Sequence, residues 1–218
     1  MGDMKILLFE QFTSLKQNLD KLVFLKEPTE KHVEYLNKED KSFEGFPIEQ
    51  FMNTPFPSNS SAKTLAEIKH INNIDKDEDF VKSTDDLHLH FKNGLERLGL
   101  KYDKKEWKKW TEESLPIIYK LKYHYNRPRP EQVAKELGMS CDGTYMKSAQ
   151  TPSYPSGHST QGVLVSLLLS DKHPEHTVEI RKLGLEIGYG RLMGKVHYQS
   201  DHNMGVDLGK CLYEYIKR

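Results

Sequence analysis

Helical spacing of apolar residues runs through most of this 218-residue chain and limits the folds open to it. Near the amino terminus the apolar residues recur every three or four positions, which places them on one face of a helix that ends by Pro28. The members of this run are Ile6, Phe9, Phe12, Leu15, Leu19, Leu22 and Val23. Further helices are expected at residues 30–40, 77–98, 103–113, 115–127, 131–137, 157–170, 174–192 and 198–216. No sustained alternation of polar and apolar residues marks a strand, so the pattern predicts an all-α, single-domain helical bundle.

A loop divides the pattern into two unequal parts. Residues 46–61 combine glycine, proline, serine and aromatic residues, and Ser61 is placed to cap a helix that follows. We therefore expect residues 1–60 to form an N-terminal helical extension that packs on the core, and residues 61–218 to form that core.

The composition limits which partners and which cellular compartment are expected for this chain. The chain has 32 Lys and Arg against 32 Asp and Glu, so no overall basic field would attract nucleic acid. Its apolar runs are too short for a secretory segment or for insertion into a membrane. Two cysteines do not make a disulfide framework. A cytoplasmic protein is expected, with export as the alternative if the numbering begins after processing.

The acidic run at Asp75–Asp79 has the alternating carboxylates of a calcium loop but lacks its glycine and its final glutamate. The start of an acidic helix is the better interpretation.

Three short fragments in the second half can bind an anion together. In the first, Lys120 and Arg127 are seven residues apart, and Pro128 follows the arginine. Ser114 is placed to cap a helix with Pro116 in its first turn. Seven residues are almost two helical turns, so both cations are expected on one face, about 10 Å apart along the axis. The alternative is two basic residues on a solvated surface.

The second fragment, Pro155-Ser156-Gly157-His158, precedes a strongly apolar helix. A helix start offers free amide hydrogens to an anion, and glycine lets the anion approach closely. Ordinary capping by Ser156 is the alternative.

The third fragment holds Arg191, His197 and Asp201. His197 and Asp201 are four residues apart, so the carboxylate can hold one imidazole nitrogen and leave the other unprotonated. A surface ion pair is the alternative. Arg191 would point away from His197 on a continuous helix, so a break at Gly194 is predicted.

The order and spacing of these fragments resemble the three-part signature of the type 2 phosphatidic acid phosphatase superfamily. The stretches Tyr154–His158 and His197–Asp201 look most like the soluble bacterial class A acid phosphatases. The resemblance covers about residues 115–210 and implies a helical fold of the class A acid phosphatase type. It also implies a phosphoric monoester hydrolase that works without a metal or a cofactor, through a phosphohistidine.

The resemblance implies a role for each matched residue. His197 would be the nucleophile, Asp201 would orient it, and His158 would be the general acid. The phosphate-binding residues would be Lys120, Arg127, Ser156, Gly157 and Arg191. The substrate would be a small phosphorylated molecule, such as a nucleotide or a sugar phosphate, and homo-oligomerisation stays open.

One position departs from the resemblance. Gly190 stands where the family usually has a serine before the arginine, so weaker anion binding or altered order around the phosphate is expected. Two alternatives remain open at this point: a vanadate-dependent haloperoxidase, which would use the same cations, and a phosphate-binding protein without catalysis.

Overall fold

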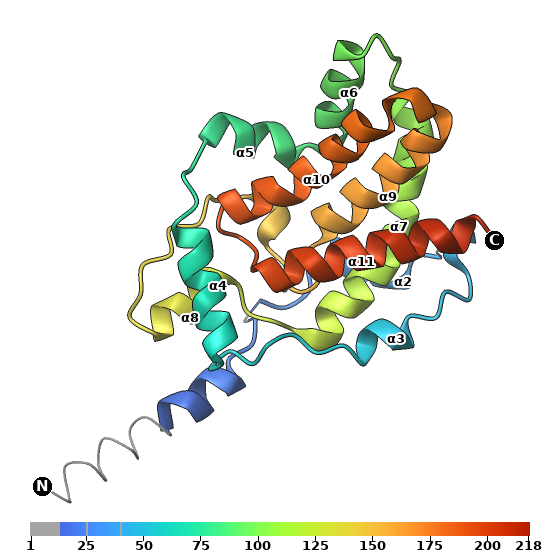
Figure 1. Cartoon of the computed structure of the whole chain (residues 1–218). Helices are drawn as coiled ribbons and strands as arrows, with labels where there is room; N and C mark the ends of the chain where they lie inside the picture. The colour runs from blue at the N-terminus through green and yellow to red at the C-terminus, as the bar shows by residue number, and fades with distance from the viewer. Residues whose placement is uncertain (1–13, 25, 40) are drawn as a thin grey trace, which may run out of the picture.

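The computed structural model describes residues 14–24, 26–39 and 41–218. Within these ranges the chain is helical, with no strand, which confirms the all-α prediction (Figure 1). Residues 14–21 are helical, whereas Ile6, Phe9 and Phe12 of the first expected helix lie outside the described residues.

The α-helices are α2 (Glu30–Asn37), α3 (Glu49–Met52), α4 (Ala62–Asn72), α5 (Glu78–Asp85), α6 (Leu87–Arg97), α7 (Lys104–Tyr125), α8 (Pro130–Glu136), α9 (Gly157–Lys172), α10 (Thr177–Met193) and α11 (Gln199–Ile216). Three short 3₁₀ turns join them: η1 (Lys41–Phe43), η2 (Lys147–Ala149) and η3 (Pro174–His176). No described helix is both long and apolar enough to cross a membrane.

Helix α9 is the centre of the molecule, between α10 and α11, with α7 crossing behind them (Figure 1). The approach of α9 to α10 depends on two facing glycines. A Cβ atom added to Gly184 would lie 2.5 Å from the carbonyl oxygen of Gly162, and the reverse substitution would meet the carbonyl of Gly184 at the same distance. Only glycine allows the two backbones to come this close.

The segment expected as an extension contributes to the hydrophobic core. Phe43, Phe46 and Phe51 are buried in one cluster with Ile117 of α7 and Leu208 of α11. Burying aromatic side chains contributes strongly to stability, because each removes a large apolar area from water. The boundary at residue 60 stays a prediction.

Two expected helix boundaries are wrong. The single helix expected at 77–98 is two helices, because Asp86 adopts an extended conformation and caps α6 through the backbone N–H of Leu89. The two helices expected at 103–113 and 115–127 are one, α7, and Pro116 lies inside it. Ser114 does not cap a helix there, since its hydroxyl donates to the Thr111 carbonyl.

Burial explains why α7 continues through its proline. A proline inside a helix costs about 3 kcal/mol. Trp107, Ile117, Ile118 and Leu121 lie on both sides of Pro116 along α7 and are all buried. Fully burying one such side chain contributes about 1.5–3 kcal/mol, so the buried face of α7 outweighs the cost.

The glycine contact between α9 and α10 makes a stability prediction. Gly184→Ala should lower the free energy of unfolding by about 1–3 kcal/mol, because the added methyl group forces the helices apart. Gly143→Ala is the matched control, since its added Cβ would meet nothing closer than 3.4 Å. Urea unfolding followed by circular dichroism measures both variants. An equal free energy of unfolding for Gly184→Ala and Gly143→Ala would contradict the prediction, because it would show that α9 and α10 can move apart without loss of stability.

Candidate active site

A pocket of about 880 Å³ opens beside the N-terminal end of α9 and the middle of α7, with α2, α5 and α6 around it. Residues of all three sequence fragments line it or lie directly behind its wall. The polar side chains in the wall include Lys122, Arg129, Ser148, His158 and His197.

His197 lies in the connection between α10 and α11, where the chain reverses. Helix α10 ends at Met193, Gly194 follows it, and Lys195 has a left-handed conformation with φ 56°. The predicted break at Gly194 is therefore confirmed. A Cβ atom added at Gly194 would lie 2.6 Å from Cε of Met146, so a side chain there would displace the end of the Met146 side chain.

The protonation of the His197 imidazole follows from its two partners. Nδ1 lies 3.0 Å from Oδ2 of Asp201, and Nε2 lies 3.0 Å from Nη1 of Arg129. A carboxylate only accepts and a guanidinium only donates, so Nδ1 carries the hydrogen and Nε2 presents a lone pair. Burial and the charge of Arg129 lower the pKa of His197 well below its ordinary value, in agreement with a neutral ring.

Asp201 is fully buried and nevertheless ionised. Burial alone would raise its pKa, but the charge of Arg127 and the hydrogen bond from His197 hold the pKa well below its usual range. Arg127 Nη1 donates to Oδ1 at 2.5 Å, and the backbone N–H of Tyr198 donates to Oδ2 at 3.0 Å. Ser153 Oγ also donates to Oδ2. Every donor fixes the carboxylate that orients His197.

Two buried cations stand beside His197. Lys122 is 4% exposed, and its Nζ donates to the carbonyl of Pro152 at 2.6 Å. Arg129 donates to the carbonyls of Thr151 and Val196 as well as to the imidazole. Burial, and then the charge of Arg129, lower the pKa of Lys122 well below normal. Asp201 raises the pKa of both cations through its charge, but no carboxylate in the described part of the chain lies within ion-pair distance of either one, so both can still attract an anion.

The cations predicted from the sequence, Lys120 and Arg127, are not the ones that line the pocket. Lys120 is exposed to solvent, because two residues turn a helix by about 200° and Lys122 already faces the pocket. The helix ends at Tyr125 with Asn126 in a left-handed conformation, so Arg127 is not on its face at all. Its guanidinium lies behind Asp201, 3.7 Å from the ring centre of Tyr198.

The start of α9 places two predicted residues differently. Gly157 lines the pocket, and a Cβ added to it would meet Lys122 Cε at 3.9 Å. Ser156 is fully buried and caps the helix by accepting from the backbone N–H of Ser159. Ser156 is therefore an ordinary helix cap, as in the alternative given for this fragment. Gly157 lies at the pocket surface near the positive end of α9.

His158 and Arg191 both contact Asp85, a residue that no sequence motif marks. Arg191 is buried and forms an ion pair with Asp85, and its Nη2 donates to Ser148 Oγ at 3.1 Å. His158 Nε2 lies 3.1 Å from the carbonyl oxygen of Asp85. Nε of Arg191 is buried and has no hydrogen-bond partner among the described residues.

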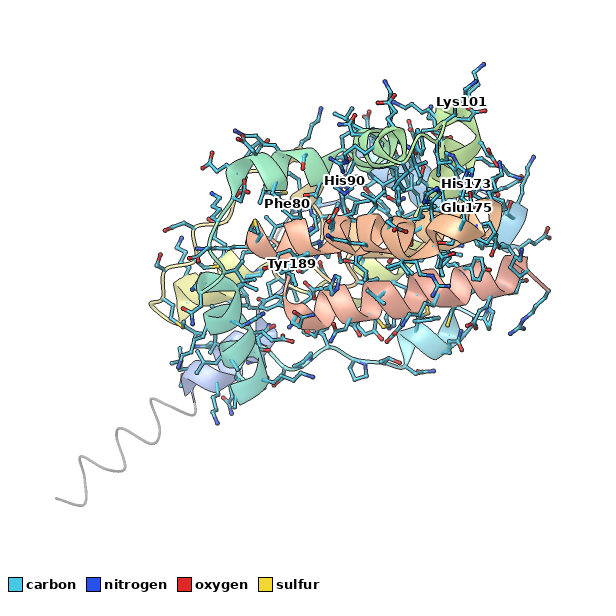
Figure 2. The ribbon with its side chains drawn as sticks, turned by 45° about the horizontal axis from the view of Figure 1, so that its top comes forward. Phe80, His90, Lys101, His173, Glu175 and Tyr189 are labelled. Carbon is cyan, nitrogen blue, oxygen red and sulfur yellow. The ribbon has the colours of Figure 1, made fainter. Side chains whose placement is uncertain are left out.

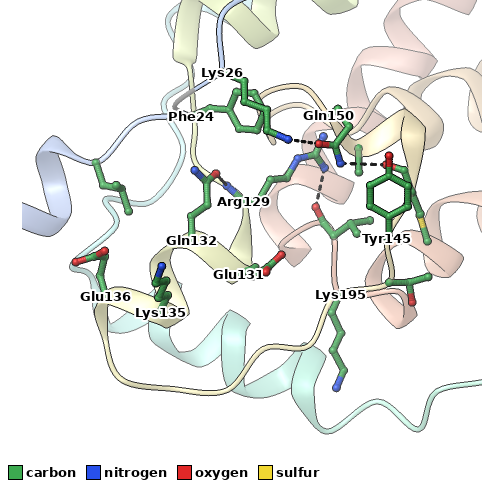
Figure 3. Close-up of a pocket in the computed structure, with 16 residues that line it drawn as sticks. Phe24, Lys26, Arg129, Glu131, Gln132, Lys135, Glu136, Tyr145, Gln150 and Lys195 are labelled. Atoms are coloured by element: carbon green, nitrogen blue, oxygen red, sulfur yellow. Dashed lines mark hydrogen bonds between the residues drawn. The ribbon is translucent and has the colours of Figure 1, made fainter.

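Arg129 also lines a second pocket, of about 590 Å³, on the far side of its side chain (Figure 3). There α8, the loop of residues 143–150 and the segment around Phe24 form the wall, and Lys26 hydrogen-bonds to Gln150. Gln132 accepts from the backbone N–H of Arg129 at 2.9 Å. The arginine is therefore held at its backbone as well as at its guanidinium.

A signal for Lys122 and Arg129 is present in the sequence. The pattern of a lysine, six residues, an arginine and a proline occurs twice, offset by two residues, and the second copy is Lys122 with Arg129 and Pro130. No comparable pattern marks Asp85, Ser148 or Ser153, whose positions depend on contacts between distant segments.

Comparisons with known proteins relate the second half of this chain to a protein family. Residues 114–216 match the PAP2 superfamily. A non-specific acid phosphatase of Salmonella typhi is 30% identical over 53% of this chain and 40% of its own length. A non-specific acid phosphatase of Salmonella typhimurium (strain LT2) is 42% identical over 26% of this chain and 23% of its own length. These matches therefore span less than half of either relative.

A solved structure shares the fold. The crystal structure of a bacterial vanadium-dependent iodoperoxidase superposes with a TM-score of 0.58 over 78% of this chain and 52% of that protein, at 18% identity. The helical architecture is thus common to both proteins.

The hydrogen-bond partners of His197 predict its titration. Its ring should stay neutral, with the hydrogen on Nδ1, well below the ordinary histidine pKa of about 6.5. Because the pKa is lower in the folded state, protons favour unfolding. This contribution to stability is lost as the pH falls below about 6.5. Two-bond ¹H–¹⁵N correlation spectra, assigned with His197→Gln, report the tautomer, and the urea-unfolded chain is the control. An imidazolium at pH 6 would contradict the arrangement.

Proposed function

Because residues 114–216 form a PAP2 superfamily domain, we propose that this protein is a phosphatase that hydrolyses small phosphomonoesters. The single observation that carries the proposal is the pair of buried cations, Lys122 and Arg129, beside the unprotonated Nε2 of His197. Cations without carboxylate partners favour an anion, and a lone pair among them favours attack on phosphorus.

Arg129, Lys122 and the amide end of α9 at Gly157 would hold the oxygens of the phosphoryl group. The guanidinium of Arg129 shares its Nη1 hydrogen with His197 Nε2, and a phosphoryl oxygen is the stronger acceptor. Substrate binding would therefore move this hydrogen bond to the phosphate and release the lone pair of Nε2. The added negative charge also favours the protonated form of Lys122.

The reaction would take place in two steps. Nε2 of His197 attacks phosphorus, the bond from phosphorus to the leaving oxygen breaks, and His158 gives that oxygen a proton. Asp201 stabilises the positive charge on the phosphorylated imidazole. Water then attacks the phosphohistidine, returns a proton to His158 and releases phosphate and free His197.

The width of the pocket supports a substrate with more than a phosphate group. Beyond the cations, the wall continues to aromatic residues of α2 and α7, including His32, Tyr35 and Tyr119. Tyr119 lies 5.1 Å from Tyr35 and 5.3 Å from His32 between ring centres. These rings supply an apolar wall for the organic part of the ester.

Purified protein should release phosphate from p-nitrophenyl phosphate, and His197→Ala should abolish turnover, because it removes the nucleophile. The loss should be at least about 10³-fold. Phosphate release measured by malachite green tests this, and acid-quenched protein should carry acid-labile phosphate. Full activity of His197→Ala would overturn the mechanism. Bromination with peroxide and vanadate, without phosphate release, would overturn the proposed reaction.

The overlapping lysine and arginine patterns give a second test. Lys122→Ala should lower kcat/KM by about 10²-fold, because a buried cation at the transition-state charge is removed. Lys120→Ala should change it less than about twofold, since Lys120 is exposed and outside the pocket. Steady-state kinetics of the two alanine variants decide between the two copies of the pattern. Equal losses would contradict the placement of Lys122.

A further inference from the structure

The contact between α5 and α10 places the carboxylate of Asp85 at the edge of the pocket. Phe80 of α5 lies against Tyr189 of α10, with 6.2 Å between ring centres. Both side chains are labelled in Figure 2. One turn further along α5, the side chain of Thr84 lies over Gly190. The next residue, Asp85, forms an ion pair with Arg191.

Gly190 is required for this contact. A Cβ atom at position 190 would lie 2.0 Å from Oγ1 of Thr84 and 2.9 Å from its Cβ. Thr84 is fully buried, and its hydroxyl donates to the carbonyls of Phe80 and Val81, so it does not swing aside. Position 190 must therefore be glycine to leave room for the side chain of Thr84. Gly190→Ser alone would displace α5. Glycine in place of the family's usual serine is therefore required by the packing of α5 against α10.

The carboxylate of Asp85 is held from two sides. Ser148 Oγ donates to Oδ1 at 2.7 Å, and Arg191 Nη1 donates to the same oxygen. The carboxylate is still partly exposed, at 35% of its side chain, on the pocket side where His158 lies. Oδ1 is 3.5 Å from Nε2 of His158.

The backbone of Asp85 fixes which nitrogen of His158 exchanges a proton. Its carbonyl oxygen, 3.1 Å from Nε2, only accepts, so Nε2 keeps its hydrogen. Nδ1 is then the nitrogen that gives and takes the proton. When Nδ1 is protonated the ring is a cation, and the carboxylate of Asp85 is the negative charge beside it.

We propose that Asp85 is the positioning residue of His158: its carbonyl orients the ring, and its carboxylate stabilises the imidazolium that protonates the leaving oxygen. This inference rests on the proposed phosphatase function. Burial and the charge of Arg191 lower the pKa of His158, and Asp85 raises it in opposition, which agrees with the geometry. Neither Arg191 nor Lys122 could do the same, since both carry positive charge.

Asp85→Asn tests the charge with little change in shape. Asparagine still accepts from Ser148 and Arg191 through its oxygen, whereas it no longer offsets the charge of the imidazolium. The readout is kcat/KM for two esters, p-nitrophenyl phosphate and glycerol phosphate. Nitrophenolate leaves without a proton, while an alkoxide requires one. We expect a loss at least about tenfold larger for glycerol phosphate than for p-nitrophenyl phosphate.

Asp86→Asn is the matched control. It removes the same charge from the next residue, which is exposed, and asparagine caps α6 as well as aspartate does. We expect it to change both kcat/KM values less than about twofold. Circular dichroism and thermal unfolding show whether each variant folds.

The outcomes separate the inference from the proposed function. Equal loss on both substrates, or no loss, with wild-type protein active, would overturn the role of Asp85 alone. Wild-type protein inactive on both substrates would overturn the proposed function, and the role of Asp85 with it. A leaving-group-dependent loss in Asp85→Asn and not in Asp86→Asn supports the inference.

The glycine contact offers an independent route to the same result. Gly190→Ser should reproduce the leaving-group-dependent loss, because it moves α5 and therefore Asp85. The exchange variant Thr84→Gly/Gly190→Ser makes room for the serine and should regain at least half of the glycerol phosphate activity. If the exchange variant folds but is no more active on glycerol phosphate than Gly190→Ser, the contact between Thr84 and Gly190 does not position Asp85.

Discussion

The ionised carboxylate of Asp201 holds the site together. It receives donors from the α7–α8 connection through Arg127, from the loop before α9 through Ser153, and from the α10–α11 connection through His197 and Tyr198. Its own backbone carbonyl accepts from Ser156 at the start of α9. Removing one of these donors would be destabilising, because a buried charge would be left less well compensated. Segments distant in sequence therefore meet in one arrangement.

Helical periodicity made most of the fold predictable. The ranges expected for α8, α9, α10 and α11 agree with the structure to within a few residues, because each has a buried face or strong end signals. At Pro116 the local chemistry favours a helix start, whereas the burial of α7 on both sides of the proline keeps the helix continuous. At Asp86 the reverse holds: the helical spacing of apolar residues continues through this position, but Asp86 is an N-cap and begins a new helix.

The site was predictable to the extent that its residues are local. His197, Asp201, His158 and Gly157 lie within short fragments, and the structure places them around one pocket or directly behind its wall. The choice of cations was not predictable, because two overlapping copies of one pattern differ only in which face of α7 is buried. Asp85 depends on the packing of α5 against α10, for which the only local trace is Gly190.

The position of Arg127 affects how the site responds to salt. Its guanidinium has no exposed surface and lies between the rings of Tyr198 and Phe56, at 3.7 and 4.8 Å from their centres. Mobile ions screen exposed charges strongly and buried pairs much less. The charge that keeps Asp201 ionised is thus insulated from the ionic strength of the surroundings. Salt can weaken the attraction of an anion to the mouth of the pocket while the hydrogen bond that orients His197 stays unchanged.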